Sequence, residues 1–342
     1  MAKRPLGVAI TLIILLCGTL ILAIAIGSVK IPPKIILELF LERLLLIENI
    51  NNSPSKFATI IFDIRMPRVA LMALTGASLA TAGATYQGLF RNPLADPYLV
   101  GVASGAGLGA TIAININLID NPLGLSTITI AAFIGGIITT SIVVLSARIN
   151  NTTPVTTMLL SGIAIGSFAT ASTTLIMLRH PDGLQKAFNW MLGAYLGGGW
   201  TPVKIMFPYV MLGILLIYFN AHALNVFQLG EEQAHQLGIN VEKLKIILIS
   251  AATLMTAAAV SFGGLIGFVG LIVPHILRTI IGSDYRKLIV FCMFGGASFL
   301  VLSDLIARNI MSPQELPVGI ITALSGTPFF IFLLRKLKNS VK

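Results

Sequence analysis

Three arginines are the residues of this chain best suited to bind a partner. Arg65 and Arg68 flank Met-Pro in the stretch FDIRMPRVALMAL, directly before a long apolar run, and Arg308 stands in SDLIARN, after another apolar run. A single arginine at the end of a membrane helix is most often an interface anchor. Three on one side instead favour an acidic partner, because guanidinium groups bind carboxylates through charge-assisted hydrogen bonds. Asp63 and Asp304 stand close by, the latter four residues before Arg308, so pairing of some of this charge within the chain is the alternative.

The composition places these arginines in a protein that spans a membrane. The chain has 342 residues, of which 56% are hydrophobic and 11% are charged, and its mean hydropathy is +0.91. A water-facing surface cannot accommodate this balance. The net charge of +10 would suggest nucleic acid as the partner of a soluble protein, but the cations are spread through loops without a basic block. We therefore expect membrane lipid around the chain and no nucleic acid.

Ten apolar segments have the length and composition of membrane spans. The first follows Lys3 and Arg4 and is too long for the core of a signal peptide, so we expect it to remain in the protein. The eighth is rich in glycine and contains Pro274, so its ends are expected to be broken or re-entrant. The segments cover residues 6–28, 67–90, 99–117, 126–147, 155–178, 203–221, 246–263, 265–280, 288–307 and 317–335.

The charges around these segments predict that both termini are cytoplasmic. An even number of spans puts the two termini on one side, and the positive-inside rule identifies that side as the cytoplasm. Arg65, Arg68 and Arg308 then face the outside, where basic residues are nearly as frequent as inside. The basic residues that set this orientation are Lys3, Arg4, Arg335, Lys336, Lys338 and Lys342.

The acidic residues argue against ion-coupled secondary transport. Between Asp96 and Glu231 the sequence has only Asp120 and Asp182, both in predicted outer loops. Ion-coupled transporters usually need ionisable groups or unwound half-helices inside the membrane. The chain also lacks the G-x-x-x-x-G-K-[ST] phosphate loop, so any ATP and magnesium would be bound by another subunit. We expect no cofactor in this chain.

A membrane enzyme is a further alternative, for which the residues give little support. The histidines do not stand in H-E-x-x-H or another metal-ligand spacing, and the two cysteines lie inside apolar runs. We therefore predict no catalytic residue and no metal site. The residues considered are His180, His222, His235, His275, Cys17 and Cys292.

The longest predicted cytoplasmic loop, residues 222–245, contains LGEEQAHQLGINVEKLK. Glu231 and Glu232 are typical of the start of a short helix, and Gly238 is typical of its end, with a second turn leading into span seven. A solvated connecting helix is the simplest interpretation. Its small residues Gly230, Ala234 and Gly238 also suit an element that fits a groove on a partner ATPase.

Several stretches, taken together and in order, resemble the FecCD family of ABC-importer permeases. They are RMPR at 65–68 running into GASLATAGATYQGLFRNPLADPYLVGVASGAGLG, LGEEQAHQLGI, GGLIGFVGLIVPHILR, SDLIARN and ELPVGIITALSGTPFFIFLL. Each motif is weak alone, but the ordered set covers nearly the whole chain. The resemblance implies an all-α membrane fold of ten transmembrane helices, the type II ABC-importer permease fold. It further implies one permease domain over residues 1–342 that forms a homodimer.

The resemblance also implies the partners and the residues that meet them. Two copies of an ABC ATPase would dock inside, and one periplasmic or lipid-anchored substrate-binding protein would dock outside. Arg65, Arg68 and Arg308 match arginines that face glutamates of the binding protein in the cobalamin permease. The loop expected to contact the ATPase supplies Gly230, Glu231, Glu232, Ala234, Leu237 and Gly238, with Arg278 and Tyr285 as weaker candidates.

A translocation path and an inner gate follow from the same resemblance. The path runs along the dimer axis, lined by spans five and ten, and span five offers small, mildly polar residues. Close helix packing through Gly162 and Gly166 explains the same pattern equally well. Spans two to five and seven to ten are expected to form an inverted repeat. The path residues are Ser161, Gly162, Gly166, Ser167 and Thr170, and the gate residues are Asn92, Pro93, Leu94, Thr156 and Thr157.

The sequence thus predicts a multi-pass permease of the cell (inner) membrane that imports a metal chelate. Iron-siderophore, haem and cobalamin are the expected cargoes, with iron-siderophore first only because it is the commonest in the family. Residues 30–56 are expected to form an amphipathic helix on the outer surface. The alternatives are an ion-coupled secondary transporter of a bulky solute and a membrane enzyme.

Overall fold

A computed structural model describes residues 5–27, 29, 31–45, 55–116, 126–193 and 198–340. Within these residues the fold is all-helical, and the β-structure is limited to an isolated bridge between Ile149 and Thr152. Four of the residues on which the predicted orientation and loops depend lie outside the described residues: Lys3, Arg4, Asp120 and Lys342.

The long helices coincide with the ten apolar segments predicted from hydropathy. They are α1 (Pro5–Ala25), α4 (Met66–Leu89), α5 (Val102–Ile116), α6 (Thr127–Ser146), α7 (Val155–Arg179), α9 (Thr201–Phe219), α12 (Val241–Gly263), α13 (Val269–Ile281), α14 (Tyr285–Asn309) and α15 (Val318–Ser340). Shorter elements connect them: α2 (Pro33–Leu45), α3 (Ser55–Thr59), the π-helix η1 (Ile60–Arg65), the 3₁₀-helix η2 (Pro97–Val100), α8 (Pro181–Met191), α10 (Ala221–Phe227) and α11 (Glu231–Gln236).

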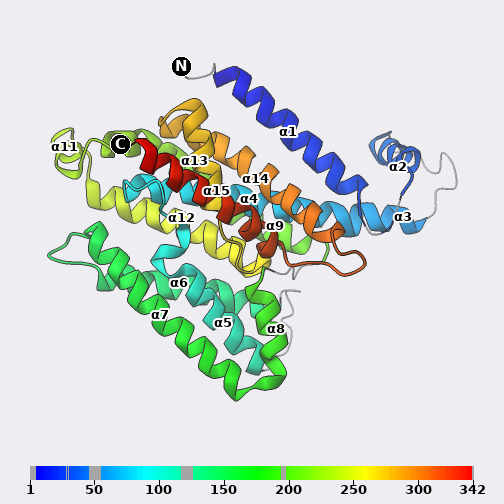
Figure 1. Ribbon diagram of the computed structural model, residues 1–342, viewed down its shortest axis with the longest axis horizontal. Helices are drawn as coiled ribbons and strands as arrows, with labels where there is room; N and C mark the ends of the chain where they lie inside the picture. Colours follow the sequence, from blue (N-terminus) through cyan, green and yellow to red (C-terminus); the bar gives the residue numbers. More distant parts are fainter. Residues whose placement is uncertain are drawn as a thin grey trace.

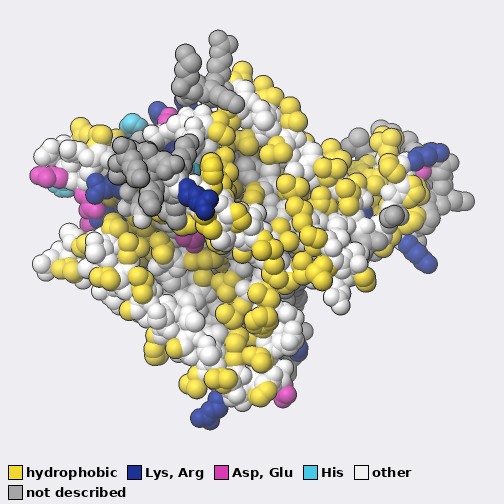
Figure 2. All heavy atoms as spheres, in the orientation of Figure 1, with side chains coloured by type: hydrophobic (Ala, Val, Ile, Leu, Met, Phe, Trp, Pro, Cys, Tyr) yellow, Lys and Arg dark blue, Asp and Glu magenta, His cyan; other side chains and the backbone are white. Residues whose placement is uncertain are grey.

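Length and composition mark six of the described helices as membrane spans: α1, α6, α7, α9, α12 and α14. Helices α5 and α13, and the part of α15 from Val318 to Phe332, are apolar but shorter. On the face shown in Figure 2, charged side chains gather toward the ends of the molecule, and apolar and uncharged atoms cover the band between them. The count of ten spans and the cytoplasmic position of the termini stay predictions.

Helix α4 lies at the centre of the bundle, where glycines allow close helix approach. A Cβ on Gly76 would collide with the backbone oxygen of Gly296 in α14, and a Cβ on Gly83 would collide with Gly270 in α13. Small residues at such crossings let helix backbones pack directly against each other. The motif GASLATAG, which begins and ends on these two glycines, therefore positions α4 between α13 and α14.

Two short helices, α5 and α13, begin after breaks in the helical backbone. Gly101 has φ 82° just before α5, and Phe268 has φ 69° just before α13. The hydroxyl of Tyr98 joins the two breaks: it donates to the backbone oxygen of Ile266 (2.8 Å) and lies 3.1 Å from the Ile266 backbone nitrogen, which donates to it. The broken start predicted for the eighth segment is confirmed, although Pro274 lies within α13. The inverted repeat stays a prediction.

The two ends of the molecule carry different elements. Figure 1 places the start of α1, the end of α15 and the short helix α11 toward one end, and α2 and α3 toward the other. The amphipathic helix expected over residues 30–56 is described in part, as α2, whereas residues 46–54 lie outside the described residues. The FDIR stretch precedes span two as expected, and it forms the end of η1, which is continuous with α4.

Candidate functional site

At the end of the molecule near α2 and α3, Arg65 closes the C-terminal end of α1. Its guanidinium donates to the backbone oxygens of Ile24 (2.8 Å) and Ala25 (3.0 Å), and also to that of Val29. The last carbonyls of a helix accept no hydrogen bond from within the helix, so a cationic donor placed there satisfies them. The wider turn of η1 ends on Arg65, and the residue is only 5% exposed.

Arg308 and Asp304, one turn apart on α14, form the centre of a cluster of charged side chains beside the end of α1. The Arg308 Nε lies 3.0 Å from Asp304 Oδ2, and its Nη2 donates to the backbone oxygen of Ala23 at 3.1 Å. The side chains are 5% and 2% exposed. Pairing within the chain, the alternative raised by their i, i+4 spacing, is therefore confirmed.

Arg68 connects this cluster to the surface. Its Nη2 and Nε donate to Asp304 Oδ1 (2.9 and 3.2 Å), and its Nη1 donates to Glu315 Oε2 (2.7 Å). The Arg68 side chain is 12% exposed and that of Glu315 is 51% exposed. Both acids and Arg68 line a cavity of about 200 Å³ beside Gly193 and the start of α15.

The structure thus brings the three predicted docking arginines together, in a cluster of Arg65, Arg68, Arg308, Asp304 and Glu315 that we call the outer arginine cluster after its predicted side of the membrane. Arg65 and Arg308 are buried and bind this chain's own groups. Arg68 and Glu315 provide the part that a partner can reach. The docking role of the three arginines stays a prediction.

At the opposite end, α11 has the predicted start and end. Glu231 and Glu232 open the helix, and Gly238 follows it with φ 84°. The backbone nitrogens of Gly238 and Ile239 donate to the oxygens of His235 (2.9 Å) and Ala234 (3.0 Å), which closes the helix in the manner of a glycine C-terminal motif.

The predicted ATPase-contact residues divide between two faces of this helix. Ala234 is fully buried against the chain's own helices, so its side chain does not face a partner. Leu237 is exposed, as is the apolar Leu229 before the helix, and Glu232 and Gly238 also lie at the surface. Gly230 and Glu231 are half-buried. A groove of about 680 Å³ runs beside α11, between it and the start of α12.

Sequence reasoning missed a buried cation next to this helix, Lys245. Its Nζ donates to Glu231 Oε2 (2.8 Å), Glu242 Oε1 (3.0 Å) and the backbone oxygen of Thr153 (3.1 Å). The predicted loop, residues 222–245, ends on Lys245, but α12 begins four residues before Lys245, at Val241. The i, i+3 spacing of Glu242 and Lys245 was the available signal.

The predicted gate residues lie in two turns. Asn92, Pro93 and Leu94 follow α4, where the Asn92 side chain accepts a hydrogen bond from the Leu94 backbone nitrogen (2.9 Å). Thr156 and Thr157 lie in the first turn of α7. Pro154 is the N-cap of α7, and its oxygen accepts from the Thr157 hydroxyl at 2.9 Å.

Four of the five predicted path residues of span five line a pocket of about 710 Å³ between α5 and α7. Gly162, Gly166, Ser167 and Thr170 belong to its wall, and Ser161 does not. A Cβ on Gly162 would collide with the backbone oxygen of Leu99, so close packing, the alternative interpretation, applies to it as well. None of the described residues in this wall is charged.

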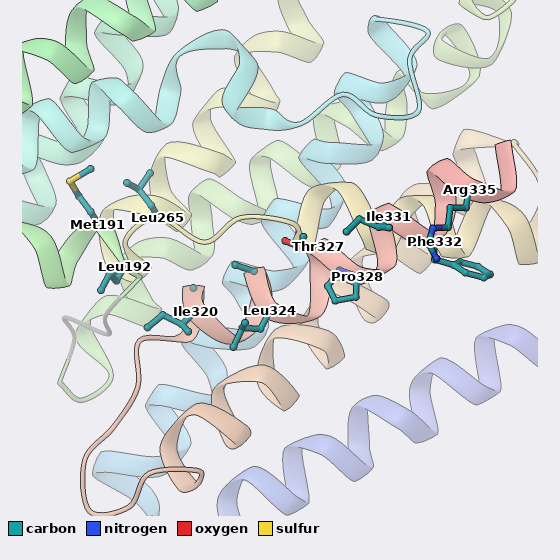
Figure 3. Close-up of a pocket in the computed structure, with 12 residues that line it drawn as sticks. Met191, Leu192, Leu265, Ile320, Leu324, Thr327, Pro328, Ile331, Phe332 and Arg335 are labelled. Atoms are coloured by element: carbon teal, nitrogen blue, oxygen red, sulfur yellow. The ribbon is translucent and has the colours of Figure 1, made fainter. Parts of the chain in front are cut away.

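A second pocket, of about 770 Å³, runs along α15 and shares Met191 and Leu265 with the first. Figure 3 shows its α15 side chains following the helix from Ile320 to Arg335, with Met191 and Leu265 at the Ile320 end. Arg335 is the charged residue among its twelve described lining residues. The two pockets therefore present a continuous, mainly apolar surface with a few hydroxyl groups.

The weaker candidates Arg278 and Tyr285 lie beside each other, with 3.5 Å between Arg278 Nη2 and the Tyr285 hydroxyl. Tyr285 is buried. Asp284, the N-cap of α14, accepts from Asn225 of α10 at 2.7 Å. Burial opposes ionisation of Asp284, but the Asn225 and Arg286 hydrogen bonds and the Arg286 charge outweigh it, so its pKa is lowered. The described residues contain no group of three or more His, Cys, Asp or Glu side chains that could hold a metal ion.

Comparison with known proteins identifies the class of this fold. The cobalamin import system permease protein of Halobacterium salinarum is 43% identical over 82% of this chain and 75% of its own length. The Fe(3+)-citrate import system permease protein YfmE of Bacillus subtilis is 34% identical over 97% of this chain and 96% of its own. A solved protein assigned to the metal-chelate type of ABC transporter, in an inward-facing conformation, superposes with a TM-score of 0.81 at 27% identity, covering 97% of this chain and all of that one.

The family assignment agrees with these similarities. The relatives are permease components of transport systems rather than enzymes. Together with the apolar helices, they show a multi-pass protein of the cell (inner) membrane. The sequence profile of the FecCD transport family matches residues 12–336, and this chain belongs to that family.

Proposed function

We propose that this chain is the transmembrane permease subunit of an ATP-driven importer that moves a metal chelate into the cytoplasm. The observation that carries the proposal is the likeness, over 97% of the chain, to a protein assigned as a metal-chelate transporter. Iron-siderophore, haem and cobalamin are the candidate cargoes, because relatives with different cargoes, cobalamin and Fe(3+)-citrate, resemble this chain over most of its length.

The path in this proposal lies between two copies of the chain. The pockets beside α7 and along α15 meet at Met191 and Leu265 and are open to the outside of the single chain. A second copy facing this surface would enclose it, which supports a homodimer. A wall with few charges and few strong hydrogen-bond donors would let a bulky chelate pass without trapping it. Selection of the cargo would then fall to the binding protein.

In this proposal the ATPase acts on the permease through α11. Two copies of an ABC ATPase, which carry the ATP and magnesium, dock on the exposed side of α11. Leu229, Glu232 and Leu237 are exposed there, and the groove along α11 provides a surface for a partner. The gate turns at Asn92–Leu94 and Thr156–Thr157 then control access to the path from inside.

The outer arginine cluster receives the substrate-binding protein, whether periplasmic or lipid-anchored. Within the cluster we assign two tasks. Arg68 meets a carboxylate of the binding protein, since its guanidinium is the one linked to the exposed Glu315. Arg65 and Arg308 hold the ends of α1 and α14 in place beneath it and add positive charge that attracts an acidic partner.

Vesicle transport tests the proposal. The tagged chain is purified with the ATPase that it retains, reconstituted into vesicles with a binding protein, and offered cyanocobalamin, haemin and a ferric siderophore in turn. We expect uptake of one of these that requires ATP and stops when the ATPase cannot hydrolyse it. Uptake that needs an ion gradient and no ATP would favour the secondary transporter instead, and a complex without an ATPase subunit would contradict the proposal.

A further inference from the structure

The ammonium group of Lys245 joins three separate segments at the α11 end. It is 2% exposed, and its three hydrogen bonds go to Glu231 of α11, to Glu242 of α12 and to the backbone oxygen of Thr153, just before α7. An ammonium group has three donors, and all three have acceptors here. The network is therefore complete, with no donor left for another partner.

Thr153 is held from both sides by this network. Its backbone oxygen accepts from Lys245, while its backbone nitrogen donates to Glu242 Oε2 at 3.0 Å and its hydroxyl donates to the same oxygen. Thr153 is 3% exposed. The next residue, Pro154, is the N-cap of α7. The start of α7 is thus fixed to α12 and, through Lys245, to α11.

The route from α11 continues to the pocket. Helix α7 begins at Val155 and carries Gly162, Gly166 and Thr170, which line the pocket between α5 and α7. On the other side of Thr153 the chain turns sharply, with φ 47° at Asn150 and 64° at Asn151, and its ends are paired by the bridge between Ile149 and Thr152. A displacement at Glu231 has a short, hydrogen-bonded route to α7.

We propose that Lys245 is a positioning residue that transmits movement of α11 to the start of α7 and so to the translocation path. This inference rests on the proposed function, in which an ATPase moves α11. A buried ion pair need not add stability, and this one links an element expected to touch the ATPase with a helix that lines the pocket. In contrast, a purely local pair would hold α12 together and leave the coupling of ATP to transport unchanged.

The test compares Lys245→Met with Lys243→Met in the reconstituted complex, measuring cargo moved per ATP hydrolysed. Lys243 lies on the exposed face of the same helix, two residues away, and is the matched control. We expect the Lys245 variant to retain its ATPase but to move at least tenfold less cargo per ATP, and the Lys243 variant to keep the wild-type ratio. Lys245→Arg, which preserves the charge and the donors, should recover part of the ratio.

A second variant removes only the contact between Lys245 and Glu231 of α11. Glu231→Ala leaves the contacts of Lys245 with Glu242 and Thr153 in place, so it addresses the link even if Lys245→Met does not fold. We expect a similar fall in cargo moved per ATP. A ratio within twofold of wild type for either folded variant would overturn the inference while leaving the proposed function intact. A wild-type complex that hydrolyses ATP and moves none of the cargoes would overturn both.

Discussion

Replacing Asp304 by asparagine would remove a negative charge that the buried guanidinium of Arg308 shares with the partly exposed guanidinium of Arg68. Asp304 is 2% exposed and contacts Arg68 through Oδ1 and Arg308 through Oδ2. Breaking a buried ion pair by removing one partner costs about 3–5 kcal/mol. Arg68 would keep Glu315, whereas the described contacts of Arg308 would fall to the backbone oxygen of Ala23. We therefore expect the free energy of unfolding to fall by about 3 kcal/mol, the lower end of that range.

Equilibrium unfolding in mixed micelles of detergent and SDS, followed by the fluorescence of Trp190 and Trp200, measures this change. Glu315→Gln is the matched control, because it removes a half-exposed charge from the same cluster and should cost about 0–1 kcal/mol. The double variant Asp304→Asn with Arg308→Met should be more stable than Asp304→Asn alone, since it no longer buries an unpaired cation. A cost for Asp304→Asn no larger than that of Glu315→Gln would refute the reasoning.

Three further predictions concern docking, packing and capping. Arg68→Glu should abolish stimulation of ATP hydrolysis by the binding protein, because it would set a carboxylate against the acidic groups of that protein. Lys56→Glu, a charge reversal at an exposed position on α3, should leave the stimulation unchanged. Equal stimulation in both variants would contradict the docking role. Gly76→Ala should lower the free energy of unfolding by about 1–3 kcal/mol, because the new methyl meets the backbone of Gly296. Gly18→Ala, with open space around it, should cost nothing, and an equal loss in both would argue against tight packing at α4. Asp284→Ala should lower the free energy of unfolding by about 1 kcal/mol through loss of the α14 cap. The pKa of Asp284 is lowered in the folded protein, so its ionised carboxylate stabilises the fold above the ordinary pKa of 3.8, and this stabilisation is lost as pH falls through the lower folded pKa. The free energy of unfolding of Asp284→Asn should therefore depend less on pH below 4 than that of the wild type.

Much of the helical architecture follows from local sequence signals. Apolar length and the glycines and prolines between the runs placed the long helices within a few residues of their observed ends. Gly238 indicated the end of α11, because helices often end on a residue with positive φ and glycine adopts that conformation most easily. The break before α13 was predicted from the several glycines before Val269. The break before α5 was not, because the single glycine at its turn, Gly101, gives a weaker signal.

The destinations of the charged side chains could not be predicted in the same way. Arg65 binds the end of α1, whose acceptors lie about forty residues earlier in the chain, and Arg68 binds Asp304 on α14, more than two hundred residues later. Such pairs depend on how the helices pack, which hydropathy does not encode. The Arg308 and Asp304 pair was accessible to sequence reasoning because it lies within one helix turn. Lys245 was missed because the start of α12 was placed too late.

Sidedness provides the most direct test of a permease with an outer arginine cluster and an inner α11. The free cysteines Cys17 and Cys292 would be replaced by alanine, and single cysteines introduced at Glu315 and at Leu237, both exposed. In intact cells a membrane-impermeant maleimide should label position 315, and it should reach position 237 only after the membrane is opened. Labelling of position 237 from outside, with position 315 protected until the membrane is opened, would contradict the proposed orientation.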